Sequence, residues 1–170
     1  FKDSFGHAVH GFDSIHIQQD SGTLWLGESK LYSDGKRGID ALVDDLFDHF
    51  NADYFNSEFN IISKRLGDSK EKIDALGHNT EEWLSLLNRY TKLSEKLDKI
   101  VIPMFCAYET TFFNDFNEDD ETFEEKYIAE IKSLDERFKS KKNTHPWNDN
   151  LNVIVILMPL KSKKQFKLLF

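Results

Sequence analysis

The sequence has a single cysteine, Cys106, and no Asn-x-Ser/Thr glycosylation sequon. One cysteine excludes an intrachain disulfide, and both absences are typical of proteins in a reducing compartment. The longest apolar runs, residues 100–108 and 153–160, are far shorter than the ~20 residues of a membrane-spanning helix. The segment that follows Phe1 also lacks the basic and apolar regions of a signal peptide. We therefore expect a cytoplasmic protein that does not interact with a membrane.

Basic residues are fewer than acidic ones: the sequence has 22 Lys and Arg residues and 30 Asp and Glu residues, which gives a formal net charge of −8. Such a balance disfavours a protein that wraps DNA through bulk electrostatics alone. Any contact with nucleic acid must then be local, through a short basic cluster. Solvated surface is the more common interpretation of the two clusters present, which are Lys139, Lys141 and Lys142, and then Lys161, Lys163, Lys164 and Lys167.

Large apolar side chains, in contrast, are plentiful. Hydrophobic residues make up 39% of the chain and 15 residues are phenylalanine, which predicts a packed core rather than disorder. A chain of 170 residues has the size of one ordinary domain and can bury that core without disulfides. We expect a single domain over residues 1–170.

The start of the chain is predicted to form a β-hairpin. From Asp13 to Gln19 apolar and polar residues alternate, as they do in a strand with one buried face. Asp20-Ser21-Gly22 has the composition of a turn, and residues 23–32 are expected to return as a second strand.

Four later segments carry helical patterns. Apolar residues recur at three- and four-residue spacings over residues 39–50, 53–66 and 123–138, which predicts amphipathic helices. Asn79 or Thr80 can cap a further helix that runs to about Leu97.

Two apolar runs predict strands in addition to these helices. Residues 151–158 have no polar face and are expected to form a central strand. Residues 100–107 contain Pro103, which cannot donate to a strand ladder and favours an edge position. The polar residues 112–120 are expected to form a loop. This order of elements predicts an α/β fold, a mixed β-sheet with flanking helices.

The residues most suited to chemistry lie in the predicted hairpin. Glu28 and Lys30 are two apart on a strand and therefore share a face, and Asp13 begins the preceding strand. Mg²⁺ prefers oxygen ligands and is usually held by one or two carboxylates, which Asp13 and Glu28 can supply together with the backbone carbonyl of Ser29. Lys30 can then orient a water molecule or offset charge that develops on a phosphate.

The Glu-x-Lys pattern alone is not specific, because a solvent-exposed ion pair on a strand has the same sequence. The context adds weight to the catalytic interpretation. An acid lies on the strand before, Gly27 allows close approach of backbone, and an amphipathic helix follows directly.

This arrangement resembles the PD-(D/E)xK nuclease superfamily, whose core places an acid on one strand and (D/E)-x-K on the next, followed by a helix. Here the motif reads Phe12-Asp13 and then Glu28-Ser29-Lys30, without the proline of the name. The segments Gly11-Phe12-Asp13-Ser14-Ile15-His16-Ile17 and Leu24-Trp25-Leu26-Gly27-Glu28-Ser29-Lys30-Leu31-Tyr32 are more specifically similar to the HamA family, effectors of the Hachiman antiphage defence system. The close similarity covers residues 1–50.

The resemblance implies a DNA endonuclease that uses Mg²⁺, or Mn²⁺ in its place. It implies Asp13, Glu28 and Lys30 as catalytic residues, with Asp13, Glu28 and the Ser29 carbonyl as metal ligands. It also implies a helicase partner similar to HamB, which holds the nuclease in check until phage DNA arrives. Many members carry an acidic residue on a helix before the hairpin, and this sequence starts too late to show one. The expected single domain therefore lacks an amino-terminal helical segment. The alternative is a catalytically inactive, nuclease-like module that docks the helicase.

Other reactive residues have more ordinary interpretations. His7, His10 and His16 lie near Asp13 and are candidates for a transition-metal site, but surface histidines are the more common finding. Cys106 lies in an apolar run, where a small buried side chain is expected rather than a nucleophile. Residues 34–37 contain Asp34, Lys36 and Arg37, which suit either a phosphate contact or a turn before a helix.

Overall fold

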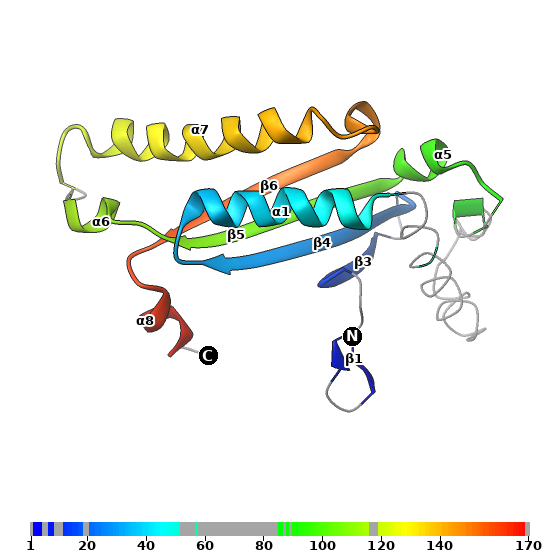
Figure 1. Cartoon of the computed structure of the whole chain (residues 1–170), viewed down its shortest axis with the longest axis horizontal. Coiled ribbons are helices and arrows are strands. Elements are labelled where there is room, and N and C mark those ends of the chain that lie inside the picture. The colour runs from blue at the N-terminus through cyan, green and yellow to red at the C-terminus, as the bar shows by residue number, and fades with distance from the viewer. Residues whose placement is uncertain are drawn as a thin grey trace. The chain divides into compact units, whose positions relative to one another are not determined.

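The computed structural model describes residues 2–4, 7–8, 12–18, 21–51, 57, 85–86, 88, 90–115 and 119–168. A two-stranded antiparallel ribbon, β1 with β2, precedes a four-stranded sheet of order β3-β4-β5-β6 (Figure 1). The strands are β1 (Lys2–Ser4), β2 (His7–Ala8), β3 (Ser14–Gln18), β4 (Thr23–Tyr32), β5 (Ile100–Glu109) and β6 (Asn152–Leu160). The helices are α1 (Gly35–His49), α5 (Leu93–Leu97), α6 (Phe112–Asp115), α7 (Phe123–Lys142) and α8 (Lys163–Lys167), with a 3-10 turn η2 (Asn148–Asn150).

The predicted hairpin is confirmed. Strands β3 and β4 pair antiparallel in a register that runs from Ser14 with Gly27 to Gln18 with Thr23. Gly22 in the turn has a φ of 62°, a left-handed conformation that glycine adopts without steric cost. Strand β4 has the predicted bounds, because apolar alternation and turn residues on both sides fixed them locally.

Helix α1 confirms the amphipathic pattern but begins earlier than its apolar stripe. Asp34 caps the helix, since its Oδ1 accepts a hydrogen bond of 2.8 Å from the backbone N–H of Arg37. The stripe itself is buried, at 0% to 3% exposure for Ile39, Leu42 and Val43. A polar first turn therefore belongs to the helix although it carries no apolar signal.

Strands β4, β5 and β6 run in the same direction, as their arrows show in Figure 1. The ends of β5 and β6 are tied by a hydrogen bond of 3.0 Å from the Thr110 N–H to the Leu160 carbonyl. The sheet is therefore mixed, with an antiparallel hairpin and parallel strands, and the predicted α/β class with flanking helices is confirmed. That the core is of the PD-(D/E)xK type, and that residues 1–170 are one domain lacking a preceding helix, stay predictions.

The expected positions of the two apolar strands are reversed in the sheet. Strand β5, with Pro103, lies between β4 and β6, so the expectation that Pro103 marks an edge is wrong. Gly27 of β4 lies beside it, but a Cβ there would make only ordinary van der Waals contact with the Pro103 Cγ, at 3.4 Å, whereas it would overlap the Ser14 Oγ, so the glycine leaves room for the Ser14 hydroxyl.

Strand β6 is the last strand of the described sheet rather than a central one. Its Ile154 and Ile156 are 42% and 46% exposed. The central-strand prediction is therefore wrong for the described sheet, since an apolar run does not specify how many neighbours a strand has.

Two further predictions need correction, and one cannot be compared. Residues 53–66 and 79–84 fall outside the described residues, apart from residue 57. The helix expected to continue to Leu97 is interrupted before α5, because the Asn88 side chain accepts a hydrogen bond of 2.9 Å from the Tyr90 N–H, and the Thr91 hydroxyl donates to the Ser85 carbonyl at 2.6 Å. Such side-chain bonds compete with helical ones. The expected loop at 112–120 contains the short helix α6, where the Phe112 side chain is buried.

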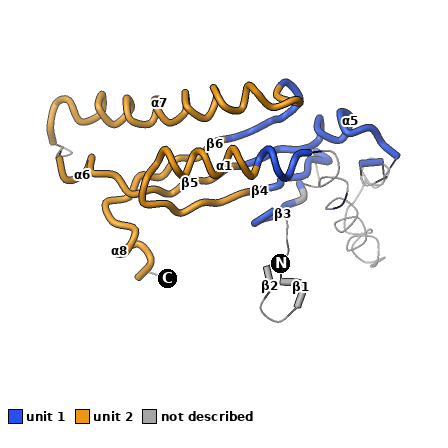
Figure 2. The backbone as a smooth tube through the Cα atoms, in the orientation of Figure 1, with its two compact units in different colours: residues 1–27, 46–103, 149–154 blue, residues 28–45, 104–148, 155–170 orange. Residues whose placement is uncertain are grey.

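The chain forms two compact units, residues 1–27, 46–103 and 149–154 in one and residues 28–45, 104–148 and 155–170 in the other (Figure 2). In the first unit, Phe12 packs edge-on against His49 and also contacts Phe50, with ring centroids 5.2 Å and 5.4 Å apart. In the second unit, Arg137 of α7 makes two hydrogen bonds to Asp40 of α1, at 2.8 Å and 2.7 Å. Within the described ranges, no helix has the length and apolarity needed to cross a bilayer.

The charge cluster around Asp40 predicts a pH-dependent contribution to stability. The hydrogen bond from Arg137 is the largest influence, and with Lys141 at 2.7 Å it lowers the pKa of Asp40 from 3.8 to about 2 despite partial burial. A depressed carboxyl pKa stabilises the fold above the unfolded-state pKa, and this contribution is lost as pH falls through the folded-state value. We expect Asp40→Asn to lower the free energy of unfolding by about 1 kcal/mol at pH 7, and by progressively less below pH 4.

Urea unfolding at pH 7, 5, 3 and 2 measures this difference. The matched control is Asp44→Asn on the exposed side of α1, which is expected to leave the unfolding free energy almost unchanged. A loss for Asp40→Asn that is the same at pH 2 and pH 7 would show that the carboxylate charge is not the cause.

Candidate active site on strand β4

Strand β4 places Glu28 and Lys30 on the same face as two buried leucines. Side chains of alternate residues point the same way, and Leu24 and Leu26 are both 0% exposed. Glu28 continues this row and is 4% exposed, whereas Ser29 on the opposite face is exposed. On this face of the strand, a buried carboxylate therefore follows directly after two buried leucines.

The burial of Glu28 bears on the two interpretations of the Glu-x-Lys pattern. A carboxylate on a solvated strand face remains largely exposed, because removing its charge from water is costly. Glu28 is among the few buried charged residues of the described chain. Glu28 is therefore not a solvated surface residue, which leaves a structural ion pair or a functional acid as its role.

Lys30 lies near the end of the same row and forms an ion pair with Asp45 of α1. The two side chains are 25% and 23% exposed. Helix α1, which follows the motif strand, thus contributes an acid that holds the lysine ammonium at the sheet. Sequence reasoning missed Asp45, since the neighbouring pair Asp44-Asp45 does not reveal which carboxylate turns inward.

Asp13 lies immediately before β3 and its side chain is exposed. The preceding residue, Phe12, is 8% exposed and anchors the start of the strand through its ring contacts. The next residue, Ser14, pairs with Gly27, the residue directly before Glu28. Asp13 belongs to the compact unit that contains residues 1–27, whereas Glu28 and Lys30 belong to the other unit.

The donor set suits a hard cation better than a transition metal. Among the described residues, no group of three or more His, Cys, Asp or Glu side chains is placed to hold a metal ion. His16 is exposed, and the side chains of His7 and His10 fall outside the description. Two carboxylates and a backbone carbonyl are all oxygen donors, and Mg²⁺ often takes only one or two protein carboxylates, with water in its other positions. The oxygen donors of Asp13, Glu28 and Ser29 are therefore of the type that Mg²⁺ prefers.

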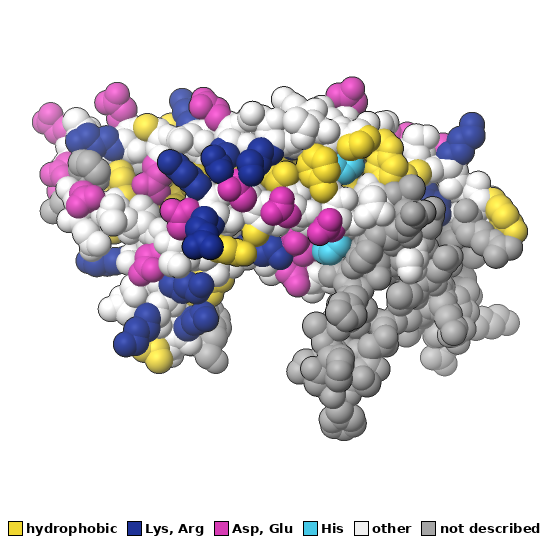
Figure 3. Space-filling view, viewed as in Figure 1, with side chains coloured by type: hydrophobic (Ala, Val, Ile, Leu, Met, Phe, Trp, Pro, Cys, Tyr) yellow, Lys and Arg dark blue, Asp and Glu magenta, His cyan; other side chains and the backbone are white. Residues whose placement is uncertain are grey.

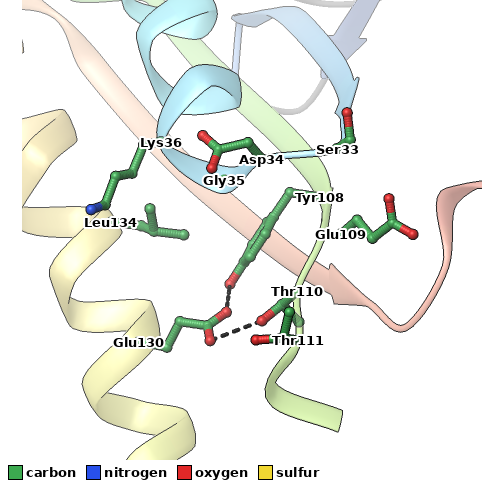
Figure 4. Close-up of a pocket in the computed structure, with 10 residues that line it drawn as sticks. All are labelled: Ser33, Asp34, Gly35, Lys36, Tyr108, Glu109, Thr110, Thr111, Glu130 and Leu134. Carbon is green, nitrogen blue, oxygen red and sulfur yellow. Dashed lines mark hydrogen bonds between the residues drawn. The ribbon is translucent and has the colours of Figure 1, made fainter. Parts of the chain in front are cut away.

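A cavity of about 360 Å³ lies in the second unit at the ends of β4 and β5 (Figure 4). Its most connected group is Glu130 of α7, which accepts hydrogen bonds of 2.8 Å from the Tyr108 hydroxyl and 3.0 Å from the Thr110 hydroxyl. Burial, and then the hydrogen bond to Glu130, raise the pKa of Tyr108 far above its usual value, so the phenol stays a neutral donor. The lining residues are Ser33, Asp34, Gly35, Lys36, Tyr108, Glu109, Thr110, Thr111, Glu130 and Leu134.

These contacts give the cavity a structural role. Asp34 is occupied as the cap of α1, so the interpretation of residues 34–37 as a turn before a helix is confirmed. The carboxylates of Asp34, Glu109 and Glu130 would also repel a phosphate group. The lining contains one lysine, Lys36, against these three acids, so the cavity does not favour a phosphate.

Cys106 is not a nucleophile in this structure. Its side chain is 0% exposed, and burial raises the pKa of the thiol to about 11. A thiol with that pKa is protonated at neutral pH and weakly reactive. The interpretation of Cys106 as a small buried side chain is confirmed.

The sequence matches the HamA family over residues 1–170, which is the whole chain. No curated protein and no solved structure matches it. The similarity inferred from residues 1–50 is therefore confirmed and covers the remaining residues as well.

Proposed function

The chain belongs to the HamA family of the Hachiman defence system, and on that premise we propose that it is the nuclease effector, a metal-dependent DNA endonuclease. It would hydrolyse phosphodiester bonds of phage DNA and would be held in check by a helicase subunit. The observation that carries the proposal is a buried carboxylate, Glu28, on the same strand face as Lys30.

In this proposal, Asp13, Glu28 and the Ser29 carbonyl would hold Mg²⁺ or Mn²⁺. The ion supplies charge neutralisation at the phosphate and lowers the pKa of bound water. Burial of Glu28 strengthens its attraction for a cation, because water screens the charge less in the protein interior. Lys30 contributes an ammonium that balances charge developing on the scissile phosphate. Asp45 fixes the position of that ammonium through their ion pair.

Plasmid cleavage by the full-length protein tests the proposal. We expect supercoiled plasmid to be cut in the presence of Mg²⁺ and to remain intact with EDTA. Asp13→Asn keeps the shape of the side chain but removes a negative ligand, and it should lower the cleavage rate by about 10²-fold or more. Cleavage by Asp13→Asn at the wild-type rate would remove Asp13 from the site.

A second candidate function is a catalytically inactive module that docks a helicase. The ion pair between Lys30 and Asp45 also suits this alternative, because a carboxylate partner can hold Lys30 in place in a protein that does not cleave DNA. The two functions differ in metal binding, which titration calorimetry with Mg²⁺ or Mn²⁺ measures on the wild type and on the double variant Asp13→Asn/Glu28→Gln. A nuclease is expected to show binding that the double variant loses. An inactive module is expected to give the same heat in both proteins.

A further inference from the structure

The two basic clusters of the sequence differ in whether their ammonium groups have partners within the chain. In the first cluster, Lys139 pairs with Asp135 at 2.6 Å and Lys141 with Asp40 at 2.7 Å. Lys142 donates to both the carbonyl and the side-chain oxygen of Asn148, at 2.9 Å and 2.8 Å. These three ammonium groups are therefore bound within the chain and contribute little to an outer binding surface.

The second cluster, which we call the α8 lysines, consists of Lys161, Lys163, Lys164 and Lys167. In the part of the chain that the structure describes, none of them pairs with a carboxylate. Lys and Arg side chains gather over α8 in Figure 3. A protein with a net charge of −8 thus carries a local concentration of positive charge that its described acids do not neutralise.

One of the α8 lysines, Lys163, lies at the end of the strand that carries the candidate site. The Nζ of Lys163 is 6.0 Å from the centre of the Tyr32 ring, and Tyr32 is the last residue of β4. Tyr32 lies four positions after Glu28 along that strand, which is ~13 Å at ~3.3 Å per residue. One DNA strand rises ~3.4 Å per nucleotide, so this distance corresponds to roughly four nucleotides.

We propose that the α8 lysines form a surface that binds the phosphate backbone of DNA and holds it along β4. The proposal rests on the proposed function. Lysine ammonium groups attract phosphates as point charges and lack the forked geometry with which arginine reads guanine. The surface is therefore a positioning surface, and its contribution to affinity should be independent of DNA sequence.

The test compares two double variants of the full-length protein that change the net charge equally. Lys164→Gln/Lys167→Gln removes two α8 lysines, and Lys92→Gln/Lys132→Gln removes two exposed lysines elsewhere. Binding of a short labelled duplex is measured by fluorescence anisotropy at several salt concentrations in EDTA, so that no cleavage is needed. Circular dichroism verifies that each variant is folded, and the single variant Lys164→Gln replaces the α8 double variant if that one is not.

We expect the α8 double variant to reduce the slope of log Kd against log salt concentration by about 2, close to 0.9 for each lost phosphate contact. With Lys164→Gln the reduction should be about 1. The loss should be the same for duplexes of unrelated sequence, and the control double variant should keep the wild-type slope. Equal changes in both double variants, or no DNA binding by the wild type, would overturn the proposal. Loss of binding to phosphatidylserine vesicles with unchanged DNA binding would also overturn it, in favour of a membrane surface.

Failure of this surface and failure of the nuclease assignment give different results. If the α8 double variant binds DNA as the wild type does while Glu28→Gln abolishes cleavage, the surface is wrong and the nuclease assignment stands. If the wild type binds DNA without cleaving it, and the α8 double variant binds DNA more weakly, the surface stands and the chain is a DNA-binding module.

Discussion

Glu28→Gln is expected to lower the rate of Mg²⁺-dependent plasmid cleavage by about 10³-fold or more. The substitution keeps the size of the side chain and removes the charge that would hold the cation. Because Glu28 is 4% exposed, the same substitution also removes a charge from a buried position. The melting temperature should therefore stay constant or rise while activity disappears, as is usual when a functional charge is replaced.

The combination of cleavage rate and melting temperature separates a catalytic Glu28 from a structural one. If Glu28 serves only to stabilise the fold through a partner, Glu28→Gln should lower the melting temperature and leave the cleavage rate of the folded protein intact. Glu136→Gln, on the exposed side of α7, is the matched control and should change neither quantity. Cleavage by Glu28→Gln at the wild-type rate would remove the nuclease site from this strand.

Substitutions at Lys30 and Asp45 extend the test to the ion pair. Lys30→Met should lower the cleavage rate by about 10²-fold to 10³-fold, because a positive group near the phosphate is lost. Asp45→Asn should have a smaller effect, about 10-fold, since Lys30 keeps its charge and loses only the partner that positions it. If Asp45→Asn leaves both rate and stability unchanged, the ion pair has no positioning role.

Gly38→Ala is expected to destabilise the protein by about 1–2 kcal/mol, although alanine is normally better than glycine inside a helix. A Cβ at Gly38 of α1 would lie 2.5 Å from the Sγ of Cys106 on β5, closer than real Cβ atoms approach a neighbour. Overpacking of this kind typically costs about 1–3 kcal/mol, which exceeds the helix-propensity gain of about 1 kcal/mol. Urea unfolding of the two proteins measures the difference.

The sign of this effect should reverse when the sulfur is removed. In a Cys106→Ala background the clash is absent, so Gly38→Ala should be neutral or stabilising by up to about 1 kcal/mol. Such a reversal is a direct measure of coupling between the two positions in a double-mutant cycle. Equal destabilisation by Gly38→Ala in both backgrounds would show that contact with Cys106 is not the cause.

The sequence alone determined those features that depend on neighbours along the chain. The hairpin of β3 and β4, its turn at Gly22 and the amphipathic stripe of α1 each follow from alternation, spacing and turn composition. The pair Glu28 and Lys30 could be recognised in the same way, because residues two apart on a strand must share a face. The order of the motif also sufficed to predict the family, which the match over residues 1–170 confirmed.

Only the tertiary structure decided which residues meet across the chain. The apolar composition of β5 and β6 did not reveal that the strand with Pro103 is internal and that β6 ends the described sheet, since neighbours in a sheet are chosen by packing between distant segments. In the same way, Lys30 gained Asp45 as a partner, and the lysines at 139–142 found partners in the chain while those of α8 did not. The pair of Lys139 with Asp135, four residues apart on α7, could be expected from local spacing. The pairs of Lys30 with Asp45 and of Lys141 with Asp40 join separate elements and depend on side-chain positions in three dimensions.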